Sequence, residues 1–278
     1  MKILITGIYG FLGTHLANKL AENHTVFGLY NTEKDVVFKK NITCFNQLDL
    51  VDIVPDVIIM CHAAVSSGTT NINKSALIET NVNFTKKIVK KFATIKSIYV
   101  SSVSIFGNQK EVVNEQSIHN PETDYALSKL FGENEVSQNP DSVIIRFSSL
   151  YGNGMKENTL IPNYCNQALE HKTIQVWGNG SRFQNYIHIS DAVRLIEKTI
   201  DYKSKISFPV LGVSSKEYSN DEVAKIISKQ TNSAIDYINQ DNSPSFHYNN
   251  KMTQKTLDWQ PEIELEKGLK QYLEWKKK

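Results

Sequence analysis

Short apolar runs alternate with longer amphipathic stretches along the first half of this chain. The apolar runs lie at 3–5, 25–30, 42–45, 57–61, 98–100 and 143–147. Most are rich in Ile and Val, and the continuous run at 57–61 is typical of a parallel strand that is covered on both faces. The stretches around 77–92 and 125–136 carry apolar residues at helical spacing. This alternation predicts an α/β fold, a doubly wound parallel sheet.

After residue 150 the pattern changes to shorter elements. Helices are predicted at 160–170, 191–200, 221–230 and 264–275, and strands at 173–176, 185–189, 208–211 and 235–238. We expect a main domain over 1–150, to which parts of 178–212 return, and a smaller C-terminal α/β lobe over 151–278. Such an arrangement places a cleft at the carboxyl ends of the strands, where ligands bind to sheets of this kind.

Composition narrows the class of protein. The 31 basic and 29 acidic residues leave a net charge of +2, which gives no electrostatic case for nucleic acid or an anionic membrane as partner. The cysteines, Cys44, Cys61 and Cys165, lie far apart without metal-ligand spacing, so we expect reduced thiols and no metal site. No apolar stretch approaches the ~20 residues that span a bilayer. We therefore expect a soluble, cytoplasmic protein.

The first twenty residues carry the earliest chemical signal. The apolar run Ile3-Leu4-Ile5 leads into a turn in which Gly7, Gly10 and Gly13 recur every third residue, and an amphipathic segment follows. Glycines in a strand-turn-helix let a pyrophosphate approach the amides at the helix N-terminus. The spacing is G-x-x-G-x-x-G, and taken alone it also fits a glycine-rich turn without a ligand.

A tyrosine and a lysine form the second signal. Tyr125 and Lys129 lie four residues apart, so both project from one face of the predicted helix. A lysine held close to a phenol lowers the pKa of the phenol, which could then exchange a proton with a sugar hydroxyl or ketone. A surface pair on an amphipathic helix is the alternative. The serine-rich strand end at 100–104 favours the first interpretation, because it would deliver Ser102 to the same cleft.

Several motifs in a fixed order point to a family. They are Gly7/Gly10/Gly13, Asp49-Leu50, His62-Ala63-Ala64, Asn81-Val82, Ser101-Ser102, Tyr125/Lys129 and Arg146 to Gly152. With them the chain resembles, over almost its whole length, the extended short-chain dehydrogenase/reductase family, in particular its nucleotide-sugar epimerase, dehydratase and reductase branch. The resemblance implies a Rossmann-like main domain that binds a dinucleotide, NAD or NADP, and a lobe that binds a nucleotide-linked sugar.

The resemblance also assigns roles to matching residues. Tyr125 matches the catalytic acid/base, Lys129 the lysine that lowers its pKa and binds the nicotinamide ribose, and Ser102 the hydroxyl that holds the reacting oxygen. Asn81 matches an asparagine with a structural and proton-relay role. The implied cofactor-binding residues are Gly7, Tyr9, Gly10, Phe11, Leu12, Gly13, Tyr30, Asn31, Asp49, Leu50, Ala63, Ala64, Asn81, Tyr125 and Lys129.

Two regions depart from the family pattern. Tyr30-Asn31 stands where NAD users have an acid and NADP users have an arginine nearby, so the preference stays open. Glu33, Asp35 and Lys34 lie close enough to substitute. In the lobe, the candidate substrate residues are Ser104, which would face the sugar, Ser149 at a family asparagine, Gln184 at a diphosphate-binding arginine, and Arg182, which could reach across. We therefore expect the residues that bind the nucleotide of the substrate to differ from the family pattern.

The absence of an acidic pair after Ser102 bears on which net reaction is expected. Relatives that dehydrate the sugar carry an Asp-Glu pair after the catalytic Ser/Thr, whereas this chain has Val103 and Ser104. The leading hypothesis is an NAD(P)H-dependent reductase of a nucleotide-linked 4-keto deoxysugar, with Tyr125 as proton donor. The alternatives are a 4-epimerase with tightly bound NAD and a non-catalytic dinucleotide-binding regulator.

A homodimer is also expected from the resemblance, formed through the helices that carry Asn81 and Tyr125. The apolar stripe of Val82, Ile88, Val89 and Phe92 permits such an interface, and core packing would explain it as well.

Overall fold

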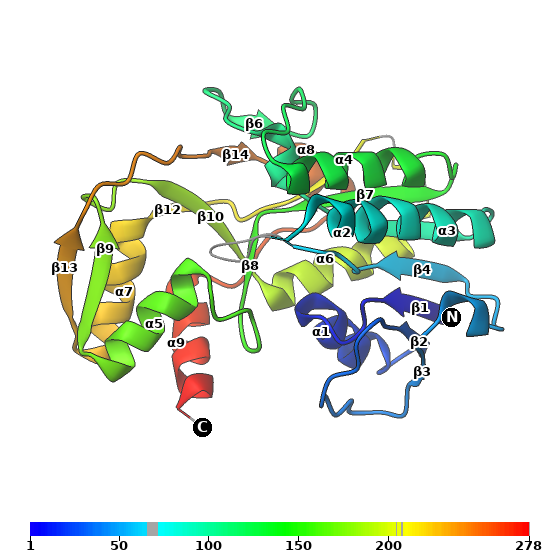
Figure 1. Cartoon of the computed structure of the whole chain (residues 1–278), viewed down its shortest axis with the longest axis horizontal. Coiled ribbons are helices and arrows are strands. Elements are labelled where there is room, and N and C mark those ends of the chain that lie inside the picture. Colours follow the sequence, from blue (N-terminus) through cyan, green and yellow to red (C-terminus); the bar gives the residue numbers. More distant parts are fainter. Residues whose placement is uncertain (66–71, 204, 207, 278) are drawn as a thin grey trace.

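A seven-stranded parallel sheet forms the centre of the main domain (Figure 1). The computed structural model describes residues 1–65, 72–203, 205–206 and 208–277. In spatial order the strands are β11 (Val210–Gly212), β7 (Ser142–Phe147), β5 (Lys96–Ser102), β4 (Val57–Met60), β1 (Lys2–Thr6), β2 (Thr25–Leu29) and β3 (Thr43–Phe45). The crossovers switch direction next to β1, which confirms the predicted doubly wound, Rossmann-like fold.

Helices cover both faces of this sheet. On one face lie α1 (Phe11–Leu20) and α6 (Ile189–Asp201), and on the other lie α2 (Lys74–Ile78), α3 (Phe84–Lys91) and α4 (Asp124–Val136) (Figure 1). Strand β4 is buried at all four positions, as its unbroken apolar run predicts. The adjacent residues Ile58 and Ile59 point to opposite faces of the sheet, and each belongs to a separate hydrophobic cluster.

One turn of π-helix interrupts the helix that was predicted over 77–92. This turn, η2 (Glu79–Asn83), joins α2 to α3 and contains the fully buried Asn81. The hydroxyl of Thr85 donates to the Asn81 carbonyl at 2.9 Å. A π turn holds one residue more than an α turn, and such turns are frequent at functional sites.

The second half builds a lobe beside the sheet. Strands β8 (Ser149–Tyr151), β10 (Phe183–His188) and β12 (Glu217–Ser219) form a small sheet, and β9 (Thr173–Trp177) pairs with β13 (Ala234–Ile238). Helices α5 (Leu160–Glu170), α7 (Asn220–Thr231) and α9 (Leu265–Lys276) pack with them around a second core that includes Tyr151 and Tyr272.

The chain crosses between the two halves several times. Helix α6 and strand β11 return to the large sheet, α8 (Lys251–Leu257) packs beside α6, and β6 (Val113–Asn114) pairs with β14 (Tyr248–Asn249). The buried Asp191 carboxylate, on α6, accepts the backbone N–H groups of Glu262 and Ile263 and pairs with Arg194. These contacts tie the C-terminal segment to the main domain.

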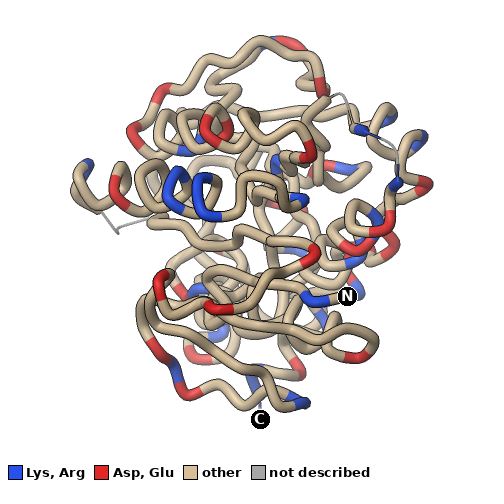
Figure 2. Tube along the Cα trace, turned by 90° about the vertical axis from the view of Figure 1, so that its right-hand side faces the viewer, with Lys and Arg blue, Asp and Glu red and all other residues tan. Residues whose placement is uncertain are grey.

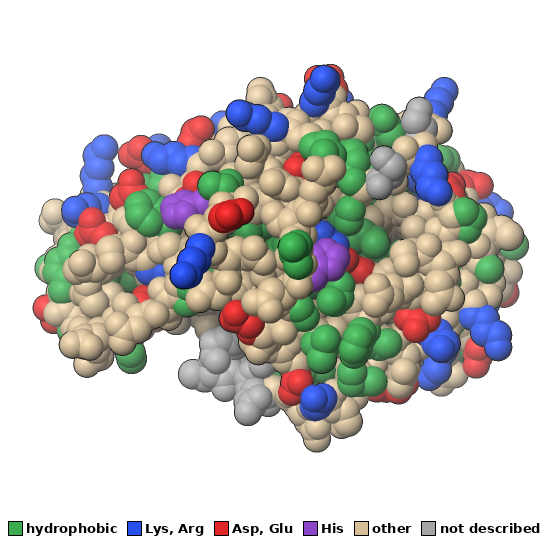
Figure 3. All heavy atoms as spheres, turned by 90° about the horizontal axis from the view of Figure 1, so that it is seen from above, with side chains coloured by type: hydrophobic (Ala, Val, Ile, Leu, Met, Phe, Trp, Pro, Cys, Tyr) green, Lys and Arg blue, Asp and Glu red, His purple; other side chains and the backbone are tan. Residues whose placement is uncertain are grey.

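Charge is spread over the molecule. Figures 2 and 3 show basic and acidic positions interspersed along the trace and over the upper face. Within the described part of the chain, no helix is long and apolar enough to cross a membrane, and no cluster of acidic, His or Cys side chains could hold a metal ion. Two members of the stripe expected at a dimer interface pack inward: Ile88 is fully buried and Phe92 is 7% exposed. Core packing accounts for these two residues, whereas Val82 and Val89 are half-buried.

Candidate active site

The glycine turn after β1 requires its glycines. Gly7 has φ +69°, and a Cβ at Gly13 would lie 2.3 Å from the Gly7 carbonyl oxygen. Gly10 is the N-cap of α1 and offers no side chain to the N–H groups of the first turn. Those unpaired N–H groups and the close approach that glycine allows fit the pyrophosphate of a dinucleotide.

Aromatic side chains surround the end of β2. The Tyr9 ring lies 5.0 Å from the Tyr30 ring and 5.5 Å from the Phe38 ring, measured between centroids. Burial, followed by contact with Cys44 and the nearby Glu33 carboxylate, raises the pKa of Tyr9 to about 12. The Glu33 carboxylate therefore lies within electrostatic reach of Tyr9, and its role as a substitute for the strand-end acid stays a prediction. The predicted cofactor residues Asn31, Asp49 and Leu50 are exposed at this rim.

Asn81 anchors the loop that follows β4. Its amide nitrogen donates to the Ala64 carbonyl at 3.0 Å and to the Ser128 hydroxyl at 2.9 Å, and its amide oxygen accepts from the Ala64 N–H at 2.8 Å. The π turn therefore fixes both the small-residue loop at Ala63-Ala64 and helix α4. The neighbouring His62 bridges Thr6 of β1 and Thr85 of α3 through its two ring nitrogens.

Ser102 and Tyr125 meet at the carboxyl end of β5. Ser102 is the last residue of β5, and its hydroxyl accepts the backbone N–H of Ser104 at 3.1 Å. Tyr125 lies in the first turn of α4, which Thr123 caps. Burial raises the pKa of Tyr125 to about 12, and a hydrogen bond with Ser102 acts in the opposite direction. The structure thus brings the predicted serine and phenol together.

Lys129 lies one turn further along α4 and is 1% exposed. Its ammonium donates to the Val100 carbonyl at 2.7 Å and lies 4.0 Å from the centroid of the Tyr99 ring. Burial lowers the pKa of Lys129 to about 7, whereas the Glu133 carboxylate raises it. Glu133 itself forms a buried ion pair with Arg146.

Burial raises the pKa of Tyr125 to about 12 in this arrangement, and the lowering expected from Lys129 stays a prediction. The ammonium is bound to the Val100 carbonyl, and burial dominates the titration of the phenol. Spacing along a helix establishes that two side chains share a face. It does not establish how far burial opposes the ionised form of either one.

The whole constellation matches one family of proteins. The family model described as "NAD dependent epimerase/dehydratase family" matches residues 3–208. The chain belongs to this family. The resemblance drawn from the motifs is therefore confirmed, the protein is an enzyme of an NAD-dependent class, and NAD is the family's cofactor.

Similar proteins span several reactions. The chain is 24% identical to a putative UDP-glucose 4-epimerase of Methanocaldococcus jannaschii, over 99% of this chain and 98% of that protein. It is 23% identical to a dTDP-4-dehydro-6-deoxy-D-allose reductase of Streptomyces, over 69% of this chain and 70% of that protein. The crystal structure of UDP-glucuronic acid 4-epimerase from Bacillus cereus, with UDP-glucuronic acid and NAD, superposes with a TM-score of 0.88 at 20% identity, covering 100% of this chain and 99% of the epimerase. This likeness shows the fold.

The family's substrate-binding positions are less complete in this chain. Ser149 on β8 is exposed, and the β8–β10 register places it opposite Tyr186, so Ser149 and Gln184 project from one face of the small sheet. Gln184 donates to the Asn220 side chain at 2.8 Å, and Arg182 donates to the Pro244 carbonyl at 3.3 Å. Both predicted lobe donors are therefore already engaged by neighbours.

Ser104 differs from these residues. Its hydroxyl is buried without a hydrogen-bond partner among the described residues. It follows Ser102 by two residues, and its backbone N–H donates to the Ser102 hydroxyl. An unpaired buried hydroxyl is rare in folded proteins and fits a group that a bound ligand completes. The prediction that Ser104 faces the sugar stays a prediction.

Sequence reasoning missed an aromatic residue in the lobe. Trp177 ends β9 with 56% of its surface exposed, immediately before Gly178, whose φ is +64°. Large exposed aromatic rings often mark recognition surfaces. In the sequence, the position of Trp177 directly before Gly178 indicates a large aromatic residue at a turn, where its ring is exposed.

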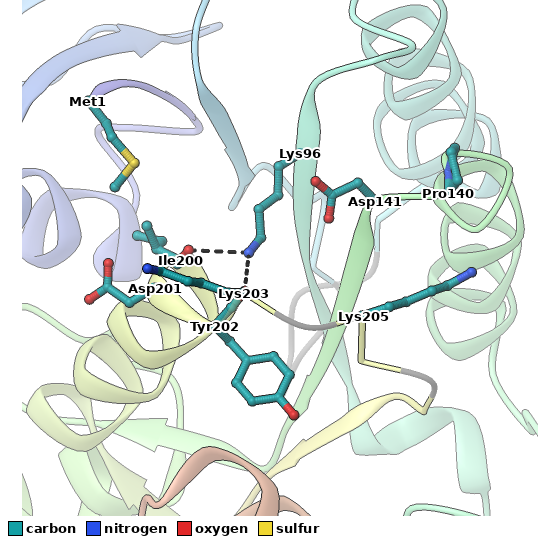
Figure 4. Close-up of a pocket in the computed structure, with 9 residues that line it drawn as sticks. All are labelled: Met1, Lys96, Pro140, Asp141, Ile200, Asp201, Tyr202, Lys203 and Lys205. Carbon is teal, nitrogen blue, oxygen red and sulfur yellow. Dashed lines mark hydrogen bonds between the residues drawn. The ribbon is translucent and has the colours of Figure 1, made fainter.

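A cavity of about 620 Å³ lies at the opposite edge of the sheet (Figure 4). Its lining includes Met1, Lys96 and Asp141, which stand at or before the amino ends of β1, β5 and β7. The Lys96 ammonium donates to the carbonyls of Ile200 and Tyr202, at the end of α6. This lysine therefore has a structural role, and the predicted catalytic residues lie at the other edge.

Proposed function

We propose that the protein transfers hydride at a secondary alcohol or ketone of a nucleotide-linked sugar, with reduction of a 4-keto deoxysugar as its net reaction. The observation that carries the proposal is the meeting of Ser102 and Tyr125 at the carboxyl end of β5, with Lys129 buried one turn behind. NAD, when bound, supplies or accepts the hydride.

Three side chains of this protein donate the proton, orient the reacting oxygen and bind the ribose. Tyr125 delivers a proton to the oxygen of the ketone, for which its high pKa makes it a protonated donor near neutral pH. The Ser102 hydroxyl, hydrogen-bonded to Tyr125, holds that oxygen in line. The Lys129 ammonium has three N–H groups, of which the Val100 carbonyl takes one, so two are left for ribose hydroxyls.

Dehydration does not fit these residues. Val103 and Ser104 open the short helix η3 (Val103–Phe106) directly after Ser102, and neither can act as the acid or base that elimination of water requires. Reduction and epimerisation need no such pair. Both therefore remain compatible with the same set of side chains.

The second candidate is 4-epimerisation, in which the hydride is removed and then returned to the opposite face of the sugar. Two relatives that carry the name of epimerase align over 99% of this chain, and so does a trifunctional relative of Arabidopsis thaliana whose name joins a dehydratase, an epimerase and a reductase. A nucleotide-linked sugar is the substrate class in either case. The homodimer stays a prediction.

The deciding experiment offers the purified protein several 4-keto nucleotide sugars with NADH or NADPH and follows cofactor absorbance. Stoichiometric oxidation of the added cofactor supports the reductase. A dinucleotide that co-purifies without exchange, together with interconversion of C4 epimers, supports the epimerase. Binding of dinucleotide without turnover of any sugar in the panel would contradict both and leave a non-catalytic binding protein.

A further inference from the structure

The Lys129 ammonium is a buried charge that needs compensation. It is 1% exposed, and moving an ammonium out of water is costly unless other groups stabilise it. The Val100 carbonyl accepts one of its hydrogen bonds at 2.7 Å. A single neutral carbonyl offsets only part of the free-energy cost of burying a cation. Other neighbouring groups must therefore stabilise the charged form of Lys129.

The Tyr99 ring provides the second contact. The Lys129 nitrogen lies 4.0 Å from the ring centroid, over the face of the aromatic system. The ring face carries partial negative charge and attracts a cation most strongly where water is excluded. Tyr99 itself is fully buried on β5, so this contact is made in the interior.

The ring is held from its other end. The Tyr99 hydroxyl lies 3.5 Å from the carbonyl of Asn81 in the π turn. Helix α4 presses on this hydroxyl through Gly132, where a Cβ would come within 2.1 Å of it. The ring therefore lies between the π turn, the catalytic helix and the ammonium, and it has little room to move.

We propose that Tyr99 is a positioning residue of this enzyme, whose ring face keeps the Lys129 ammonium charged and directed toward the cofactor ribose. The role in catalysis rests on the proposed function, because it acts through Lys129. The contact between ring and ammonium does not depend on which reaction the enzyme performs.

Other groups also act on the ammonium, and their effects on the pKa of Lys129 must be distinguished from the effect of the Tyr99 ring. The Glu133 carboxylate on α4 favours the charged form of Lys129. Cys61 at the end of β4 and His62 after it also lie within electrostatic reach of Lys129. Variants at position 99 leave all three in place, so a change in titration can be assigned to the ring.

The test replaces Tyr99 by phenylalanine and by phenylalanines with increasing numbers of ring fluorines. Fluorine withdraws charge from the ring face while the shape and burial of the side chain change little. The pKa of Lys129 is measured without cofactor or substrate by competitive acylation, with Lys129→Met identifying the labelled site. We expect Tyr99→Phe to keep the wild-type pKa, and full fluorination to lower it by about one unit.

A second readout follows the cofactor. The dissociation constant of NAD is measured by calorimetry at pH 6 and pH 8. The fully fluorinated variant should bind about tenfold more weakly at pH 8 but only about twofold more weakly at pH 6, where a pKa lowered by one unit still leaves about half of Lys129 charged. Tyr99→Phe serves as the matched control.

Two outcomes would overturn the proposal. A Lys129 pKa that does not move across the fluorinated series would mean that Tyr99 only fills the core. Equal loss of NAD affinity at both pH values would point to a distorted site instead of a lost charge. Failure of the reductase or epimerase assignment would leave the fluorine dependence of the pKa unchanged, so the two failures can be told apart.

Discussion

The network around Asn81 and His62 and the C-terminal lobe differ in how their buried polar side chains are paired. Around the glycine turn, buried polar groups bond to one another across elements: Asn81 holds Ala64 and Ser128, and His62 bridges two threonines. In the lobe, the buried phenol oxygens of Tyr151 and Tyr186 have no hydrogen-bond partner among the described residues, and the same holds for the hydroxyls of Ser101 and Ser104 at the end of β5. The Asn81–His62 network is thus bonded without a ligand, whereas the lobe and the end of β5 keep unsatisfied groups.

We expect specificity for the sugar to reside where unsatisfied groups remain, in the lobe and at the end of β5. A bonded network holds its members in one geometry, which suits a cofactor and a reaction that many relatives share. Unpaired groups cost free energy in the folded chain and fit a region that a particular substrate completes. Variants in one region at a time measure what each region contributes.

The largest effect is expected from Tyr125→Phe. Loss of the proton donor should lower kcat about 10²- to 10⁴-fold, because that is the usual contribution of a positioned acid. NAD binding should change less than about threefold, since Lys129 and the glycine turn are untouched. Steady-state kinetics and calorimetry measure the two effects. Undiminished turnover would remove Tyr125 from the mechanism.

Acid should destabilise the cofactor half through His62. Burial lowers the pKa of His62 to about 3, from an ordinary value of 6.5. The unfolded chain therefore binds a proton below pH 6.5 that the folded chain refuses, and the free energy of unfolding should fall by about 1.4 kcal/mol for each pH unit from 6.5 down toward 3.

His62→Gln should flatten this dependence, measured by urea denaturation between pH 7 and pH 4. The matched control is His171→Gln, because the His171 side chain is 70% exposed. A profile that keeps its slope in His62→Gln would assign the acid sensitivity to other groups.

Asn81→Ala should release the loop at Ala64. Three buried hydrogen bonds are lost, so we expect the free energy of unfolding to fall by about 2 to 3 kcal/mol, together with weaker NAD binding. Asn83→Ala removes an exposed bond to Glu79 from the same π turn and should cost less than about 0.5 kcal/mol. Equal losses in both variants would mean that the turn, and not the Asn81 amide, holds the loop.

The smallest effect is expected from Arg182→Ala in the lobe. Its guanidinium donates to the Pro244 carbonyl and lies near Asp241, so we expect KM to change less than about threefold. Gln184→Arg, which restores the family's residue, should strengthen binding of UDP by about tenfold. A tenfold rise in KM for Arg182→Ala would show that this arginine grips the substrate.

The sequence predicted the sheet and the meeting of Ser102 with Tyr125 because both depend on local signals. Unbroken apolar runs identify buried parallel strands, and Ser102, Tyr125 and Lys129 stand at spacings that the fold brings together. Strands β6, β8, β12 and β14 were missed, because two or three residues show no periodicity. The roles of Tyr99 and Glu133 were missed as well, since an aromatic in a strand and an acid in a helix have ordinary structural explanations.

The number of residues in the π turn determines where Asn81 lies. Between α2 and α3 the helix accommodates one residue more than an α-helix would, and this extra residue accompanies the inward placement of Asn81. Deleting one residue other than Asn81 from 79–83 would restore a regular helix and rotate everything before it by about 100° relative to α3. Every side chain could remain chemically intact while the loop at Ala64 lost its anchor. In this segment the count of residues matters as much as their identity.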